Sequence, residues 1–102
     1  MPAFNFLDIN EPITLAPITV GQAVVEVYQT AAWLALGDKQ HRCRALVMSV
    51  EAAAVRMGDG NVSATQGALL PVATYFMYKN RGSLKLYCPS GTATINITLG
   101  LD

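Results

Sequence analysis

The sequence contains little charge. Only 14% of its 102 residues are charged, and seven lysines and arginines balance seven aspartates and glutamates. Soluble domains usually carry roughly 25% charged residues. A chain without net charge has no electrostatic attraction for nucleic acid or for an anionic membrane surface. We therefore expect no nucleic-acid partner and no membrane partner.

Long apolar runs and a secretory leader are also missing. The uncharged residues 12–25 include two prolines and several polar interruptions, so we expect no transmembrane helix there. The opening MPAFNFLDINEP has neither the basic region nor the apolar region of a signal peptide. We expect synthesis and folding in the cytoplasm.

Reactive side chains are few. His41 is the only histidine, and no Gly-x-Ser-x-Gly elbow accompanies it. His41 and Cys43 would share one face of a strand, which leaves a Cys–His dyad or, in the ordinary case, a strand-end histidine beside a buried cysteine. One histidine and two cysteines match no zinc-ligand spacing. The sequence predicts no enzyme, no metal and no cofactor, and it favours Cys43 and Cys88 as reduced core residues over a disulfide.

Asp59-Gly60-Asn61 could be a ligand loop or a bend between strands. A calcium loop beginning at Asp59 needs a carboxylate at position 70, which is Leu70. Glycine and asparagine tolerate the positive φ of tight turns. We therefore predict a turn, with Gly60 at positive φ.

Apolar residues make up 52% of the chain, and short β-type runs alternate with turn signals. The predicted strands are residues 13–20, 23–28, 43–50, 52–57, 62–65, 74–78, 84–87 and 92–99. The first of these is an edge strand or is broken at Pro17, which cannot donate a hydrogen bond. Residues 30–36 are too few for a stable helix and are expected as strand or irregular chain. Residues 67–71 are predicted as a loop.

This pattern predicts an all-β protein: a single small antiparallel β-sandwich or jelly-roll-like barrel with an extended N-terminal arm. The arm is residues 1–12 and the β domain is residues 13–102. The clearest strand is the last, where Ala93, Ile95, Ile97 and Leu99 alternate with polar residues, as in a half-buried strand.

Several motifs in the second half carry a family resemblance. They are A-A-V-R-M-G-D-G at residues 53–60, the polar V-S-A-T at 62–65, G-A-L-L-P at 67–71 and S-G-T-A-T-I-N-I-T at 90–98. Together they resemble small virion structural proteins of tailed bacteriophages, over roughly residues 43–101. The resemblance implies a non-enzymatic β-sandwich, and a trimer is a common arrangement for such proteins.

The function that the resemblance implies is capsid decoration. Such a protein binds and bridges subunits of the major capsid protein, stabilises the head and resides on the virion surface. The residues expected to contact partners are the arm residues and two aromatic residues taken to lie at the surface: Phe4, Phe6, Leu7, Ile9, Trp33 and Tyr78. The alternative for each of them, and for Trp33 equally, is packing in the core of the domain itself.

Two alternatives remain open. One is a neck or tail component, which differs only in its partner. The other is a carbohydrate-binding module of a host-recognition fibre, which predicts an exposed aromatic platform drawn from Tyr75, Phe76, Tyr78 and Tyr87.

Overall fold

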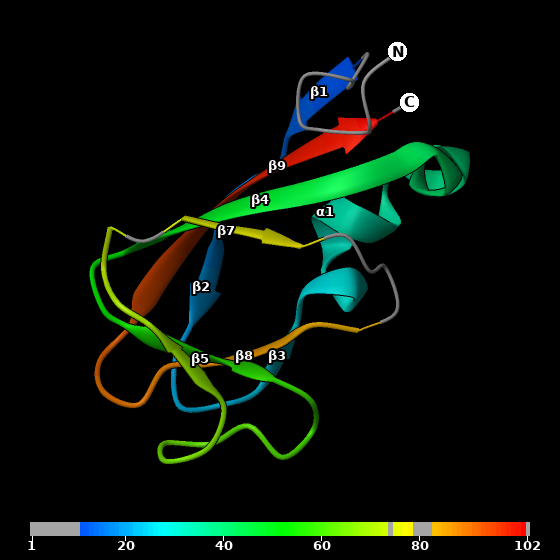
Figure 1. The fold of residues 1–102 in the computed structure, drawn as a ribbon. Coiled ribbons are helices and arrows are strands. Elements are labelled where there is room, and N and C mark those ends of the chain that lie inside the picture. Colours follow the sequence, from blue (N-terminus) through cyan, green and yellow to red (C-terminus); the bar gives the residue numbers. More distant parts are fainter. Residues whose placement is uncertain (1–10, 74, 79–82, 102) are drawn as a thin grey trace, which may run out of the picture.

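The computed structural model describes residues 11–73, 75–78 and 83–101 (Figure 1). Within these ranges the chain is mostly strand and forms two antiparallel sheets, which confirms the all-β prediction. The strands are β1 (Glu11–Thr14), β2 (Ile18–Val20), β3 (Val25–Glu26), β4 (Cys43–Glu51), β5 (Val55–Gly58), β6 (Ala68–Leu70), β7 (Tyr75–Tyr78), β8 (Lys85–Tyr87) and β9 (Ala93–Leu101).

The larger sheet is built on the long pair β4 and β9. Its strand order is β1-β9-β4-β7, and β2 also pairs with β9, beyond the end of β1. The prediction of a strand broken at Pro17 is confirmed, because β1 and β2 both run along β9 and the proline lies between them. Proline has no N–H to contribute to the ladder, so the strand is interrupted there.

The smaller sheet has the order β3-β8-β5-β6. The predicted strand at residues 62–65 is wrong, and so is the predicted loop at 67–71, because the strand that pairs with β5 is Ala68–Leu70. Residues 59–66 are engaged in local turns, in which the Val62 N–H donates to the Asp59 carbonyl and the Ser63 N–H to that of Gln66. These turns delay the return strand by several residues.

A short helical stretch connects the two sheets. It comprises the 3-10 turns η2 (Val27–Gln29) and η3 (Gly37–Arg42), with the single-turn helix α1 (Ala31–Leu34) between them. The expectation of a strand or irregular chain at residues 30–36 is therefore wrong, and the strand predicted at 23–28 is reduced to Val25–Glu26. Tertiary packing decides this region, because a helix of one turn has no stability of its own.

The strand predicted at residues 52–57 begins three residues later. Ala52 has a left-handed φ of 75°, and the Ala53 N–H donates to the Glu51 carbonyl at 2.9 Å. A hydrogen bond between residues two apart around such a φ is a tight γ-turn. This turn ends β4 and redirects the chain into the other sheet.

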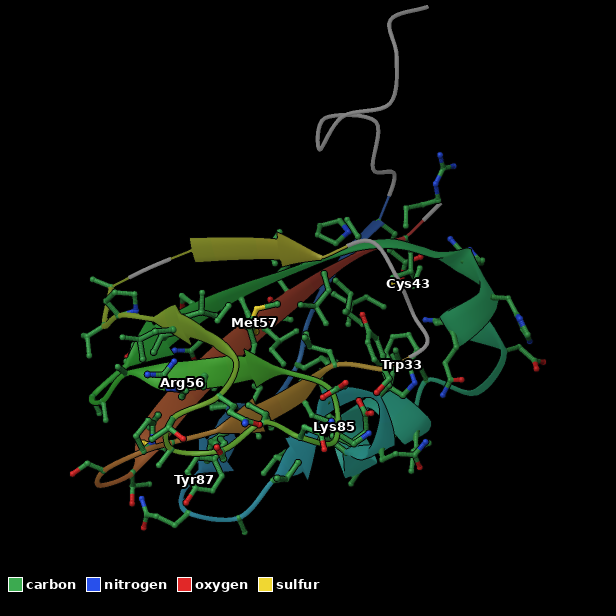
Figure 2. All side chains as sticks on the ribbon, turned by 60° about the horizontal axis from the view of Figure 1, so that its bottom comes forward. Trp33, Cys43, Arg56, Met57, Lys85 and Tyr87 are labelled. Carbon is green, nitrogen blue, oxygen red and sulfur yellow. The ribbon has the colours of Figure 1, made fainter. Side chains whose placement is uncertain are left out.

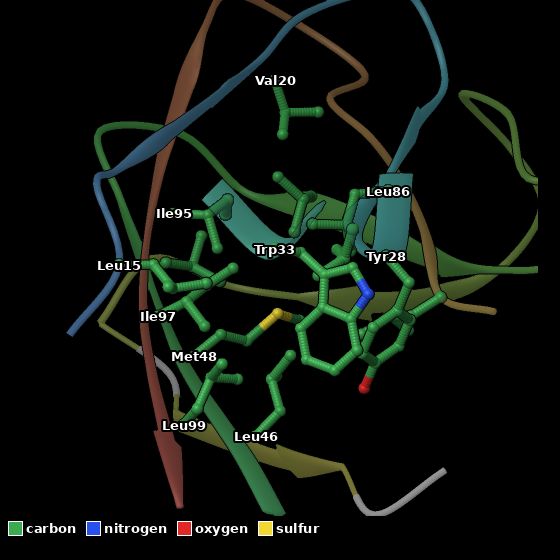
Figure 3. Packing of buried hydrophobic residues seen from close by; sticks show 14 of the residues in the cluster. Leu15, Val20, Tyr28, Trp33, Leu46, Met48, Leu86, Ile95, Ile97 and Leu99 are labelled. Carbon is green, nitrogen blue, oxygen red and sulfur yellow. The ribbon is translucent and has the colours of Figure 1, made fainter. Parts of the chain in front are cut away.

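Buried apolar side chains from both sheets and from the helical stretch form one core (Figure 3). In β9 the predicted alternation is confirmed: Ala93, Ile95, Ile97 and Leu99 are buried, while the residues between them are half-buried. Leu46 and Met48 face the same core from β4, as do Leu84 and Leu86 from the β8 segment. Among the described residues no polar or charged side chain is buried.

The boundary of the predicted arm changes by two residues. Glu11 and Pro12, expected at the end of the arm, belong to β1, where Glu11 lies opposite Leu101 and Pro12 opposite Gly100. Residues 1–10, with Phe4, Phe6, Leu7 and Ile9, lie outside the described residues.

Candidate interaction surface

The one strongly perturbed carboxylate in the described part of the chain belongs to Glu26, on β3. Its oxygens accept hydrogen bonds from Ser83 Oγ at 2.6 Å, Leu84 N at 2.9 Å, Lys85 Nζ at 3.0 Å and Tyr28 N at 3.1 Å. Burial raises the pKa of Glu26, but these four donors favour the ionised form more strongly, and the net pKa falls to about 2. A carboxylate saturated in this way fastens β3, η2 and β8 together and is not free to act as an acid or a base.

The Cys–His arrangement does not form a dyad. His41 is exposed in η3, whereas Cys43 is buried, with its Sγ 3.6 Å from the Ala45 carbonyl oxygen. Cys43 lies opposite Leu101 at one end of β9, and the Cys88 N–H bonds Gly21 near the other end, where Val20 pairs with Ala93. These two ends are separated by the length of β9, about 27 Å at the usual strand rise. Cys43 and Cys88 form no disulfide, in agreement with the prediction of reduced core residues.

Asp59-Gly60-Asn61 forms a bend in a loop that is bonded to itself. The Asp59 carboxylate accepts from the Asn61 N–H at 2.8 Å, and the Val62 N–H closes the turn on the Asp59 carbonyl. The predicted turn is confirmed. Positive φ at Gly60 is wrong, because the left-handed glycines are Gly37, Gly67 and Gly91. An ordinary turn with aspartate at its first position needs no left-handed residue.

Arg56 and Gly67 hold this loop to β5. Arg56 donates from Nε to the Ala64 carbonyl at 3.0 Å and from Nη1 to the Gly67 carbonyl at 2.8 Å. Gly67 has φ +108°, and a Cβ on it would lie 2.8 Å from the Met57 carbonyl oxygen. Arg56 of the first resembling motif therefore bonds Ala64 of the second and Gly67 of the third, and it lies opposite Tyr87 on the smaller sheet (Figure 2).

Trp33 does not lie at a surface. It is 5% exposed and packs edge to face on Tyr28, with ring centroids 4.7 Å apart. The expectation that Trp33 contacts a partner is corrected: α1 turns the ring into the core, where it gains more by burial than it would in water. Tyr78 lies opposite Leu46 in the register of β4 and β7, and its side chain is outside the described part of the molecule.

The surface that departs most from ordinary solvated surface is a run of exposed apolar residues that we call the apolar edge segment, residues 68–73. Leu69 is 50% exposed and Val72 49% exposed, and Ala68, Pro71 and Ala73 are exposed as well. Leu70 alone points into the core. The segment is anchored at its far end by the Ala73 N–H, which donates to the Val50 carbonyl at 2.8 Å.

The apolar edge segment lies on an open sheet edge. β6 is the last strand of the smaller sheet, and among the described residues β5 is its only strand partner. Natural edge strands are commonly protected by charged side chains. Here no charged residue occurs from Gly60 to Tyr78. Sequence reasoning missed this surface by assigning residues 67–71 to a loop, and the long uncharged run is the signal that could have revealed it.

The other exposed large apolar residues are dispersed. Val24 precedes β3 and Leu34 lies on α1, each with no exposed large apolar neighbour in the adjoining described chain. Single exposed apolar residues are normal on soluble proteins. Among the residues whose exposure is described, only the apolar edge segment combines several of them.

The aromatic platform predicted for a sugar-binding module does not lie within one sheet. Tyr87 is on β8 in the smaller sheet, whereas the positions of Tyr75, Phe76 and Tyr78 are on β7 in the larger sheet. In the described part of the chain Tyr28 and Trp33 are buried, and Tyr87 is half-buried.

Metal-binding and membrane-spanning features were sought in the described ranges. No three histidine, cysteine, aspartate or glutamate side chains cluster there closely enough to hold a metal ion. No helix in those ranges has the length and apolar character needed to cross a bilayer.

No protein-family model matches this chain, and comparisons with curated proteins and with solved structures give no match either.

Proposed function

We propose that this chain is a non-enzymatic structural protein of a tailed-bacteriophage virion, and specifically a capsid decoration protein. It would bind the major capsid protein on the head surface, bridge neighbouring subunits as a homo-oligomer, with a trimer favoured, and stabilise the particle. The observation that carries the proposal is the apolar edge segment, a surface of the kind that other protein chains cover.

The bonding of charged side chains to other groups of the same domain supports the same proposal. The Glu26 carboxylate and the Arg56 guanidinium are both bound to groups of the domain itself. A decoration protein gains its binding energy from apolar contact and complementary shape, and it needs no strained or perturbed catalytic group. The resembling motifs between residues 53 and 71 build the smaller sheet and its edge, and the motif at residues 90–98 contributes to β9 of the larger sheet.

In this proposal the N-terminal arm is the clamp on a neighbouring subunit. The arm contributes Phe4, Phe6, Leu7 and Ile9, and extended arms can add a strand to a sheet edge. Tyr78 stays a proposed contact, and Trp33 is withdrawn because it belongs to the core.

The proposal is tested on particles of the phage that encodes the chain. Mass spectrometry of purified virions should find the protein in a fixed ratio to the major capsid protein, and immunogold labelling should place it on heads. Label confined to necks or tails would identify the alternative location, and absence from virions would overturn the proposal. A glycan array on the isolated protein should give no binding, whereas specific sugar binding would favour the fibre module.

Deletion of residues 1–10 tests the clamp. The deletion leaves β1 intact from Glu11, so far-UV circular dichroism should stay that of a β protein. Attachment to heads lacking the protein should fall at least tenfold in cosedimentation. Leu34→Lys, at an exposed leucine on α1, is the control and should attach like the wild type. If the deleted protein attaches in full amount, the arm is not the clamp.

A further inference from the structure

The apolar edge segment and β1, the strand that follows the N-terminal arm in the sequence, lie on opposite sides of the fold. The arm joins the larger sheet at β1, which is one edge of the order β1-β9-β4-β7. The apolar edge segment leads directly into β7, the opposite edge of that sheet, and its own strand β6 is an edge of the smaller sheet. In Figure 1, β1 is at the far end of the molecule from β5, the neighbour of β6.

The length of the arm limits what it can reach on its own domain. Ten residues span at most about 33–36 Å when fully extended. To reach β6 of its own domain, the arm must pass from β1 across the width of the larger sheet, which is three strand spacings or about 14 Å. It must also cross the distance between the two sheets, about 10 Å, and run along the length of the molecule. Such a path uses most of the arm, and few residues are left to lie along the acceptor strand.

If the arm instead reaches β6 of a neighbouring copy, it does not have to cross its own domain. We propose that residues 1–10 of one subunit dock on the apolar edge segment of the next copy of the same chain, with β6 as the acceptor strand. The inference rests on the proposed function and deepens it by naming the subunit that receives the arm. Because β1 and the acceptor strand lie on opposite sides, the proposed contact is head-to-tail, and the proposed trimer requires that successive contacts close into a ring.

The chemistry of the two partners is matched. The arm contains a single charged side chain, Asp8, and the acceptor region from Gly60 to Tyr78 contains none. Phe4 and Phe6 are two residues apart, a spacing that places both on one face of an added strand, where they can cover Leu69 and Val72. Pro71 ends β6, so backbone pairing is limited to Ala68–Leu70 and the remaining contact is between side chains.

The first test compares two exposed leucines in the full-length protein. Leu69 is 50% exposed on β6, and Leu34 is 52% exposed on α1. By light scattering at micromolar concentration, the wild type and Leu34→Lys should form a closed oligomer of about three chains. Leu69→Lys should fall to the 10.9 kDa monomer, a threefold loss of mass, with unchanged circular dichroism. A wild-type monomer, or an oligomer that persists in folded Leu69→Lys, would overturn the inference.

The second test identifies the contact and does not depend on a disruptive substitution. Phe6→Cys and Leu69→Cys chains, one of them mass-labelled, are co-expressed and oxidised, and the linked peptides are identified. A disulfide between residue 6 of one chain and residue 69 of the other is expected. Phe6→Cys with Leu34→Cys is the control and should stay unlinked. A chain that carries both Phe6→Cys and Leu69→Cys is also diluted with wild type. A disulfide within one such chain would show that the arm folds back on its own domain and would overturn the inference. The absence of a disulfide in every pairing would overturn it as well.

Head binding separates this inference from the proposed function. If the protein cross-links as expected but binds no heads, the arm exchange is supported and the decoration role is contradicted. If the protein binds heads through its arm but the Leu69→Lys variant stays oligomeric, the decoration role is supported and the arm exchange is contradicted.

Discussion

Trp33 and Tyr28 meet edge to face in the core, with their ring planes at 78° and both side chains at most 5% exposed. Tyr28 comes from η2 and Trp33 from α1. This pair fixes a helical segment that is too short to be stable alone. It also removes the only tryptophan from the surface.

Trp33→Ala should therefore act on folding. Replacing a buried aromatic ring by a methyl group costs roughly 3–5 kcal/mol. Urea unfolding monitored by circular dichroism measures the loss. Leu34→Ala, next to it but half exposed, should cost less than about 1 kcal/mol. Equal effects at the two positions would contradict the assigned orientation of α1.

Gly67→Ala should destabilise the protein, whereas Gly60→Ala should not. A Cβ at Gly67 would lie 2.8 Å from both the Met57 carbonyl oxygen and Val62 Cγ2, at a φ of +108°, but a Cβ at Gly60 meets nothing within 4 Å. We expect a loss of about 1–3 kcal/mol at Gly67. At Gly60 we expect a change between zero and a gain of about 1 kcal/mol. Thermal unfolding of the two variants gives the comparison, and a reversed order would exclude this loop geometry.

Ala52→Gly should stabilise the protein, against the usual direction of that substitution. Ala52 has a left-handed φ of 75° in the γ-turn after β4, and glycine relieves this conformation by about 1 kcal/mol. Ala53→Gly, one residue later, lacks this benefit and should lower the melting temperature. If both substitutions destabilise, Ala52 is not left-handed in solution.

Glu26 should make the stability depend on acid pH. Its folded-state pKa of about 2 is below the ordinary value of 4.5, so its contribution is fully present above pH 4.5 and is lost as the pH falls towards 2. Glu26→Gln should lower the stability at pH 7 by about 1–3 kcal/mol. It should also flatten the fall between pH 4.5 and 2, as measured by urea midpoints.

Glu51→Gln serves as the control for this prediction at pH 7. The Glu51 carboxylate is exposed and accepts a hydrogen bond from the Asn96 amide on the outer side of the larger sheet. Its replacement should change the stability by less than about 0.5 kcal/mol. A larger loss of stability at Glu51 than at Glu26 would show that the partly buried hydrogen bonds of Glu26 are not the more stabilising ones.

Local patterns in the sequence predicted the elements that depend only on neighbours along the chain. The alternation in β9 and the interruption at Pro17 each follow from a short-range rule of side-chain direction or backbone donors. The all-β class follows from the sum of such signals.

The wrong predictions concern residues whose structure depends on contacts with distant segments of the chain. Residues 62–65 have strand-like letters, but the turn at Asp59 and the hydrogen bonds of Arg56 to Ala64 and Gly67 leave the pairing with β5 to residues 68–70. Residues 31–34 form a helical turn whose Trp33 ring packs on Tyr28 in the core. Neither outcome can be found from a local window.

The sequence by itself determined the class of fold, the low charge and the scarcity of reactive groups, because each is set by composition or by period-two alternation. Only the tertiary structure decided which apolar residues stay outside. Leu69 and Leu70 are adjacent and identical, yet one is 50% exposed and the other 9%. Their difference depends on the pairing of β6 with β5, which turns one side chain to the core and leaves its neighbour on an open edge.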